Sequence, residues 1–206
     1  MDESKRIKIL EAATMVFAEK GYQYATIADI AKEAGISTGL LYSYFENKLD
    51  VLLSIVLYFL NEINNLNIER LDSLNDPVKK LHALLQNFEE MLLKNDYTLS
   101  LTKVLHEAHP HTVMIKDEGL KKKRLKIMKA NRYLVATIDE IMRYGQEQGV
   151  FDDSLKPSAM RQVLMGTMER MIYGLFFKTF TSGEIGYDRD DAHDAIMLVI
   201  EKFIRK

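Results

Sequence analysis

The sequence predicts an all-α protein of about nine helices, because apolar residues recur at helical spacing along most of the chain. Only three prolines and ten glycines interrupt the 206 residues, and the alternating β-branched pattern of strands is scarce. With 47% hydrophobic residues and a net charge of −2, the composition is typical of a soluble protein with one or two domains.

Residues 26–48, TIADIAKEAGISTGLLYSYFENK, predict two short helices joined by a tight turn. Thr26 can cap the first helix, and Asp29 stands at the position that completes an acidic capping box. Gly35 suits the left-handed residue that ends this helix, and Ser37 can cap the next one. Two helices joined in this way form a helix-turn-helix, which indicates a DNA-binding unit.

The second of these helices indicates which side chains would face DNA. With Leu41 and Phe45 turned inward, the outer side carries Gly39, Leu40, Tyr42 and Ser43. An outward Leu40 suits contact with a thymine methyl group, and close approach of another surface would explain the glycine beside it. The hydroxyls of Tyr42 and Tyr44 and the ammonium of Lys48 can reach phosphates at the edges of the groove.

Around this motif the sequence resembles the N-terminal domain of tetracycline-repressor-type (TetR) regulators. The matching patterns are ILxAAxxxFxEKGY at residues 9–22, TIxDIA at 26–31 and AGISxGxxYxYFxNK at 34–48. The resemblance implies a homodimeric, all-helical transcription factor with a C-terminal ligand-binding domain. The DNA contacts that it implies, mostly to phosphates, fall on Thr26, Ser37, Thr38, Gly39, Tyr42, Tyr44 and Lys48. Base contacts in this family come mainly from variable positions, so Leu40 and Ser43 are the candidates for them.

We expect a helix-turn-helix DNA-binding domain over residues 1–48 and a helical effector-binding and dimerisation domain over residues 49–206. Gly21 should end the first helix, and Pro77 should stand at the first position of the helix that follows a long one without Gly or Pro. Besides the two short helices of the motif, helices are expected at about 4–20, 47–71, 77–95, 97–108, 117–149, 157–180 and 188–205.

The last two of these helices, 157–180 and 188–205, are apolar on more than one side. Such a helix has a second surface to bury, besides the one that faces its own domain. We predict that this second side packs against another copy of the chain and forms a four-helix dimer interface. The family resemblance implies the same arrangement. The alternative is that both helices are fully buried within one chain.

The middle helices are rich in methionine and aromatic residues, which suit an adaptable pocket for a small effector. The same residue types also build ordinary core, which is the alternative interpretation at each position. The effector is expected to be largely apolar or amphipathic, and Arg170 would pair either with an acidic group on it or with a neighbouring carboxylate. The candidate pocket residues are Phe88, Met91, Tyr97, Met128, Tyr133, Met142, Met165, Met168, Arg170 and Tyr173.

A histidine cluster in the middle of the chain contains His106, His109 and His111. Imidazoles with a nearby carboxylate are plausible zinc or nickel ligands. Pro110, however, redirects the chain before the third histidine, so the residues do not converge by spacing alone. We therefore predict a polar turn here and no metal site.

The most basic stretch is KKKR at residues 121–124, together with Lys116, Lys126 and Lys129. A solvated helix face is one interpretation of this run. The other is a landing site for the phosphates of an anionic ligand such as an acyl-CoA.

Several classes of protein are excluded or disfavoured. The chain has no cysteine, which excludes disulfides, thiolate metal sites and cysteine nucleophiles. The GxSxG, P-loop and dinucleotide-binding fingerprints are missing, so we expect neither an enzyme nor a bound cofactor. The charged start MDESKRIK is unlike a signal peptide, and no apolar run approaches the roughly 18 residues of a membrane span, so we expect a cytoplasmic protein without membrane contact.

Together these observations predict a ligand-responsive transcriptional regulator that binds a palindromic double-stranded operator as a homodimer. A small effector would release it, and repression is the mode that the family resemblance implies. A ligand-independent architectural DNA-binding protein is one alternative. A metal-dependent hydrolase built on the histidine cluster is the other.

Overall fold

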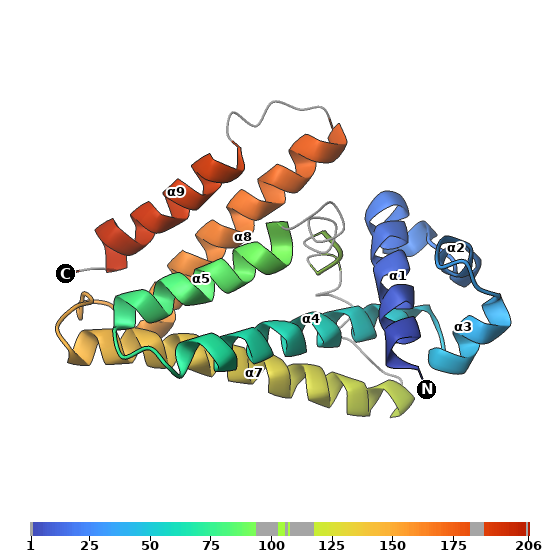
Figure 1. The fold of residues 1–206 in the computed structure, drawn as a ribbon, viewed down its shortest axis with the longest axis horizontal. Helices are drawn as coiled ribbons and strands as arrows, with labels where there is room; N and C mark the ends of the chain where they lie inside the picture. The colour runs from blue at the N-terminus through green and yellow to red at the C-terminus, as the bar shows by residue number, and fades with distance from the viewer. Residues whose placement is uncertain (1, 94–102, 106, 108–117, 182–187, 205) are drawn as a thin grey trace. The chain divides into compact units, whose positions relative to one another are not determined.

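The computed structural model describes residues 2–93, 103–105, 107, 118–181, 188–204 and 206 of the chain. Apart from turns and connections these residues are helical, which confirms the all-α prediction. The elements, shown in Figure 1, are α1 (Glu3–Tyr24), α2 (Ile27–Glu33), α3 (Thr38–Tyr44), α4 (Lys48–Leu71), α5 (Pro77–Leu93), α7 (Glu118–Glu147), α8 (Pro157–Thr181), α9 (Arg189–Val199) and the π-helical η1 (Ile200–Ile204).

The chain forms two compact units. The first unit consists of Met1–Asn61 and Asn95–Ala130, and the second of Glu62–Lys94 and Asn131–Lys206. The division falls inside α4 and inside α7, so each of these long helices contributes residues to both units. The functional division expected from the sequence, at residue 48, concerns DNA binding and effector binding and stays a prediction.

In the first unit α2 packs against both α1 and α3, and the three helices form a cluster visible in Figure 1. Their apolar faces meet in a core whose large side chains are at most 1% exposed: Leu10, Phe17, Ile30, Leu41 and Phe45. Full burial of a side chain of this size stabilises the fold by about 1.5–3 kcal/mol. This core fixes which side of α3 faces outward.

The helix ends follow the predicted pattern, with one difference in α1. Gly21 has a φ of 76°, and the helix kinks there as its position predicts. The sequence predicts an end at Lys20, but residues up to Tyr24 are helical again. The reason is that the Ala25 N–H donates to the Gly21 carbonyl at 3.1 Å, which closes a further turn after the kink.

The predicted helix at 97–108 falls mostly outside the described residues, of which 103–105 and 107 are helical. The last predicted helix is confirmed as α9, which Asp188 caps through a capping box with Asp191, and it continues into η1. The long predicted helices agree with α4, α7 and α8 to within a few residues.

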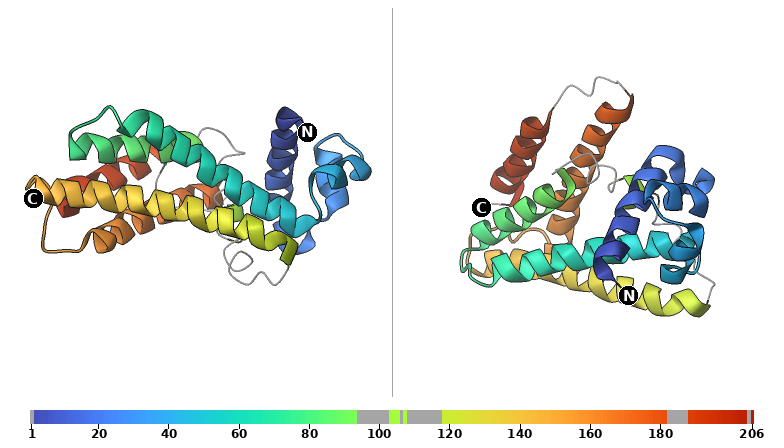
Figure 2. Two further views of the ribbon diagram at one scale, coloured as in Figure 1. Left: turned by 90° about the horizontal axis from the view of Figure 1, so that it is seen from below. Right: turned by 45° about the vertical axis from the view of Figure 1, so that its right-hand side comes forward.

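The second unit contains α5, α8 and α9 with the adjoining parts of α4 and α7. Helices α8 and α9 pack side by side, as Figure 1 and the right-hand view of Figure 2 show. The core of this unit consists of apolar side chains that are at most 1% exposed, among them Leu81, Leu84, Met142, Leu164 and Ile196. One face of each helix is therefore used within the unit.

The connection after α7 folds back onto the end of that helix. The N–H groups of Val150 and Phe151 both donate to the Gly145 carbonyl, at 2.9 and 3.0 Å. The Phe151 ring is fully buried, and it lies so close to Gly145 that a Cβ atom there would collide with it. A glycine inside a helix is therefore required by packing.

By length and composition, α4 is the one described helix that is apolar enough to cross a membrane. However, 61% of its most apolar window is buried inside the protein. This degree of burial is that of a core helix.

We predict that Gly145→Ala lowers the free energy of unfolding by about 1–3 kcal/mol, because the new methyl group overpacks the Phe151 site. Urea denaturation with the Gly145→Ala/Phe151→Ala double variant as control measures the effect. In the Phe151→Ala background, Gly145→Ala should leave the free energy of unfolding unchanged or raise it. An equal cost in both backgrounds would contradict this explanation.

Candidate DNA-binding surface and effector site

The start of α2 has the capping geometry that the sequence predicts. Thr26 Oγ1 accepts a hydrogen bond from the Asp29 N–H at 3.1 Å, and Asp29 Oδ2 accepts one from the Thr26 N–H at 2.9 Å. At the other end Gly35 has a φ of 65°, and the Ile36 N–H donates to the Ala31 carbonyl at 2.9 Å. Local groups therefore satisfy the backbone at both ends of this short helix.

Asp29 also connects α2 to α1. Lys20 Nζ donates to Asp29 Oδ1 at 2.7 Å, and Thr26 Oγ1 donates to Asp29 Oδ2 at 2.7 Å. The hydrogen bond from Lys20, followed by those from Thr26, lowers the pKa of the Asp29 carboxyl from 3.8 to about 2. The same contact raises the pKa of Lys20. The carboxylate that completes the capping box is therefore ionised throughout the neutral range.

Helix α3 begins as predicted, with Ser37 Oγ accepting from the Leu40 N–H at 3.1 Å. Its outer side carries Thr38, Gly39, Tyr42 and Ser43, all exposed, with Leu40 and Tyr44 half-buried beside them. A Cβ atom at residue 39 would meet nothing nearer than Ser37 Oγ at 4.0 Å. Packing inside the protein thus gives no reason for this glycine, and close approach of DNA to it stays a prediction.

Lys48 has a structural role that the sequence did not indicate. Its Nζ donates to the carbonyl oxygens of Tyr22, Gln23 and Ala25 at 2.7, 3.1 and 2.7 Å, and lies 4.7 Å from the centre of the Tyr22 ring. These bonds use all three hydrogens of the ammonium group. A phosphate contact by Lys48 stays a prediction. It would require that Lys48 give up one of these three hydrogen bonds.

A second lysine supports the same end of α1. Lys103 Nζ donates to the Ala18 carbonyl at 2.6 Å. Neither lysine could be found by spacing, because the partners are backbone carbonyls 23–26 and 85 residues away in the chain.

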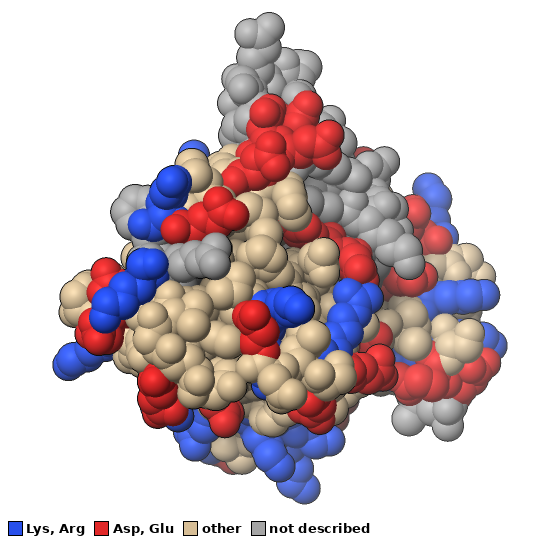
Figure 3. Space-filling view, turned by 60° about the vertical axis from the view of Figure 1, so that its left-hand side comes forward, with Lys and Arg blue, Asp and Glu red and all other residues tan. Residues whose placement is uncertain are grey.

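Charges of both signs are mixed on the surface. Figure 3 shows a face on which Lys and Arg are interspersed with Asp and Glu. In the basic run Lys121, Lys122, Lys126 and Lys129 are exposed, whereas Lys123 is half-buried and forms an ion pair with Asp50. Lys116 lies outside the described residues. With a net charge of −2, affinity for DNA has to come from local placement of groups.

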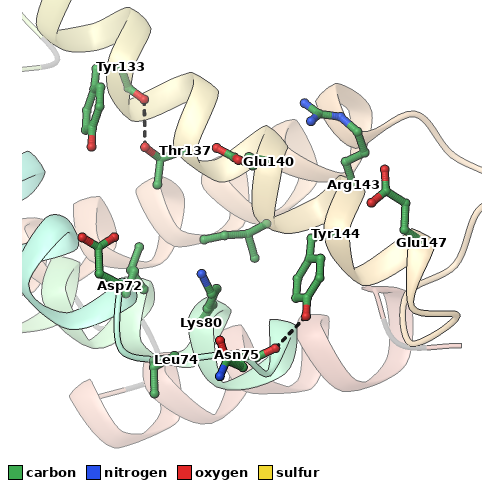
Figure 4. A pocket seen from close by; sticks show the side chains of 12 residues that line it. Asp72, Leu74, Asn75, Lys80, Tyr133, Thr137, Glu140, Arg143, Tyr144 and Glu147 are labelled. Carbon is green, nitrogen blue, oxygen red and sulfur yellow. Dashed lines mark hydrogen bonds between the residues drawn. The ribbon is translucent and has the colours of Figure 1, made fainter.

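A cavity of about 370 Å³ opens in the second unit between the α4–α5 connection and α7. Figure 4 shows its side chains: Asp72 and Lys80 on one side, Tyr133, Glu140 and Tyr144 on the other. The Tyr144 hydroxyl donates to the Asn75 carbonyl at 2.9 Å and joins the two sides. The lining carries several charges, and it therefore differs from the apolar effector pocket that the sequence predicts.

The predicted pocket residues are spread over several environments. Phe88, Met142 and Met168 are buried, Met91 and Met165 are half-buried, and Met128, Tyr133 and Arg170 are exposed. The placement of Tyr97 and of the Tyr173 side chain lies outside the described part of the chain. Of the ten, Tyr133 lines the cavity above. An apolar effector pocket among these residues stays a prediction.

The histidine cluster at His106, His109 and His111 also lies outside the described residues. Within the described part of the chain, no group of three or more His, Asp or Glu side chains is placed to hold a metal ion.

Two family profiles match most of the chain. Residues 9–55 match "Bacterial regulatory proteins, tetR family", and residues 58–179, more than half of the chain, match "YsiA-like protein, C-terminal region". The chain belongs to the TetR family. It is thus a DNA-binding transcriptional regulator and not an enzyme, and the matched region at its N-terminus contains the helix-turn-helix described above.

Relatives of this TetR-family chain are similar to it in sequence or in structure over most of its length. The "Fatty acid metabolism regulator protein" of Bacillus subtilis (strain 168) is 28% identical over 171 residues, 82% of this chain and 81% of that protein. The structure of FadR from Bacillus subtilis in complex with stearoyl-CoA has a TM-score of 0.68 at 22% identity, covering 95% and 98% of the two chains. That of AibR in complex with isovaleryl coenzyme A and operator DNA has a TM-score of 0.71 at 19% identity, covering 94% and 97%.

Two apolar side chains of this TetR-family chain are exposed on the predicted dimerisation helices. Val163 of α8 is 46% exposed and Leu198 of α9 is 53% exposed. On the same helices Leu164 and Ile196 are buried within the second unit. Each helix therefore has one exposed apolar side chain besides its buried face, and a dimer interface formed by α8 and α9 stays a prediction.

We predict that the Asp29 carboxyl titrates with a midpoint near pH 2 in a side-chain NMR titration of the folded protein. Because its pKa is lowered on folding, its contribution to stability is present above pH 3.8 and is lost as the pH falls toward 2. Lys20→Met should raise the midpoint more than Thr26→Ala, since the Lys20 contact is the larger cause. A midpoint of 3.8 in the unaltered protein would contradict the hydrogen bonds that Lys20 and Thr26 donate to this carboxylate.

Proposed function

We propose that this protein is a homodimeric transcriptional repressor of the cytoplasm that binds a palindromic operator and is released by an acyl-CoA. The observation that carries the DNA-binding half is the outward face of α3, where a glycine without an internal reason stands among exposed hydroxyls. The effector half is carried by the two similar structures whose ligands are stearoyl-CoA and isovaleryl coenzyme A.

On the operator, α3 would enter the major groove with Leu40 and Ser43 toward base edges. The hydroxyls of Thr38 and Tyr42 are exposed and can donate to phosphates. In a dimer, the α3 helices of the two copies would lie about one helical turn of DNA apart, roughly 34–36 Å. This spacing fits a palindromic site. A dimer also doubles the phosphate contacts, which a chain with a net charge of −2 needs.

The dimer would form through the outer faces of α8 and α9. Val163 and Leu198 are about half exposed in the single chain, and a second copy would remove both from water. Packing two helices from each copy gives the four-helix interface predicted from the sequence.

The effector would combine an apolar acyl chain with an anionic head group. Met142 and Met168, buried in the second unit, are adaptable side chains that can rearrange around an acyl chain. The exposed lysines of the basic run, which belong to the first unit, are a separate candidate for contact with the phosphates of an anionic ligand. Effector binding would favour a conformation with another spacing of the two α3 helices, and by linkage it would weaken operator binding as much as the operator weakens effector binding.

The effector test uses an operator duplex selected from random sequences and a fluorescence-anisotropy titration. Stearoyl-CoA should weaken operator affinity about 5–150-fold, the usual range of allosteric coupling, whereas free coenzyme A and stearate should have much smaller effects. Lys122→Glu with Lys126→Glu should reduce the response to stearoyl-CoA and leave operator affinity without ligand nearly unchanged.

An operator affinity that no acyl-CoA changes would reject the effector half of the proposal and favour a ligand-independent DNA-binding protein. If the selection yielded no duplex that the protein binds, the DNA-binding half of the proposal would be rejected.

We also predict that Val163→Asp with Leu198→Asp yields a monomer in analytical ultracentrifugation, because each carboxylate would be buried without a partner in the dimer. The monomer should bind the operator far more weakly, since it contacts one half-site only. Leu155→Asp is the control, because Leu155 is 47% exposed but lies before α8. A variant that remained dimeric would show that the interface lies elsewhere.

A further inference from the structure

Lys123 differs from the other lysines of the basic run. Its ammonium forms an ion pair with a carboxylate oxygen of Asp50 and donates to Ser54 Oγ at 2.7 Å. The Asp50 side chain is only 7% exposed, and that of Lys123 is 23% exposed. These residues belong to the first unit, where Lys123 comes from the start of α7 and the other two from α4. Its charge is therefore engaged within the protein.

The other oxygen of Asp50 holds the connection between α3 and α4. Asp50 Oδ2 accepts a hydrogen bond from the Glu46 N–H at 3.0 Å, and the Asp50 N–H donates to Asn47 Oδ1 at 2.9 Å. Glu46 directly follows Phe45, the C-cap of α3. The Asp50 carboxylate thus links the residue that follows the C-cap of α3 to the first turn of α4. The same carboxylate forms the ion pair with Lys123.

Lys123 also lies near Phe45, the C-cap of α3. Its Nζ is 6.0 Å from the centre of the Phe45 ring, at the limit of a cation–π interaction, and Arg6 Cζ is 5.6 Å from the same ring. Phe45 is 1% exposed and forms part of the core that supports α3. A residue of α7 therefore contacts both sides of the α3–α4 connection.

We propose that Lys123 is a positioning residue for operator binding, which fixes the α3–α4 connection through Asp50 and makes no contact with DNA. Among the described residues it provides the counter-charge for a nearly buried carboxylate. Without Lys123, the Asp50 carboxylate would be more stable when turned toward water, because an unpaired buried charge is costly. That movement would release the Glu46 N–H and with it the end of α3. The inference rests on the DNA binding of the family and is independent of the effector.

The test compares Lys123→Met with Lys122→Met, which removes an exposed charge from the neighbouring position of the same run. Operator affinity is measured by fluorescence anisotropy at several salt concentrations. Lys123→Met should weaken binding at least about tenfold with an unchanged salt slope, because no phosphate contact is lost; losing one would reduce the slope by about one. Lys122→Met should change the affinity little.

A second variant separates positioning from simple loss of folding. Lys123→Met with Asp50→Asn removes both charges and leaves an amide oxygen to accept from the Glu46 N–H. If Lys123 acts through Asp50, this double variant should bind the operator within about threefold of the unaltered protein, better than Lys123→Met alone. A double variant as weak as Lys123→Met would overturn the proposal. A reduced salt slope for Lys123→Met would also overturn it, in favour of a direct phosphate contact.

Discussion

The recognition helix is too short to hold its own shape. Both α2 and α3 contain seven residues, and isolated helices below about 12–15 residues are marginal in water. Their conformation depends on burial of Leu41 and Phe45 in the core of the first unit and on side chains that satisfy the backbone at the helix ends. The outer side chains of α3, which we predict to face DNA, are positioned by these few contacts. A small change at either end of α3 would therefore move the whole outer surface.

Lysines from distant parts of the chain complete this support. Lys48 and Lys103 donate to carbonyls near the end of α1, and Lys123 pairs with Asp50 beside the end of α3. These charges act inside the protein. A count of basic residues in the sequence therefore overestimates how many are free to meet phosphates. In a chain with a net charge of −2, hydroxyl groups and the doubling of contacts in a dimer gain importance.

Local signals predicted the DNA-binding part well. The caps at Thr26 and Ser37 and the positive φ of Gly35 each depend on residues within about one turn, so sequence spacing determines them. The lysine contacts were not predictable, because their partners are distant carbonyls or a carboxylate with no distinguishing sequence pattern. The predicted effector pocket had the weakest support from the sequence. Buried Met142 and Met168 show the same apolar spacing whether they build core or line a pocket, and the sequence has no signal that separates the two.

The two units share α4 and α7, so each of these helices contributes residues to both units. We propose that acyl-CoA binding to the dimer weakens its affinity for the operator. Native mass spectrometry of the protein with its operator duplex and increasing stearoyl-CoA tests this most directly. We expect the dimer–duplex complex to be replaced by a dimer carrying the acyl-CoA without DNA. A complex that holds both ligands at saturation without loss of duplex would contradict the account.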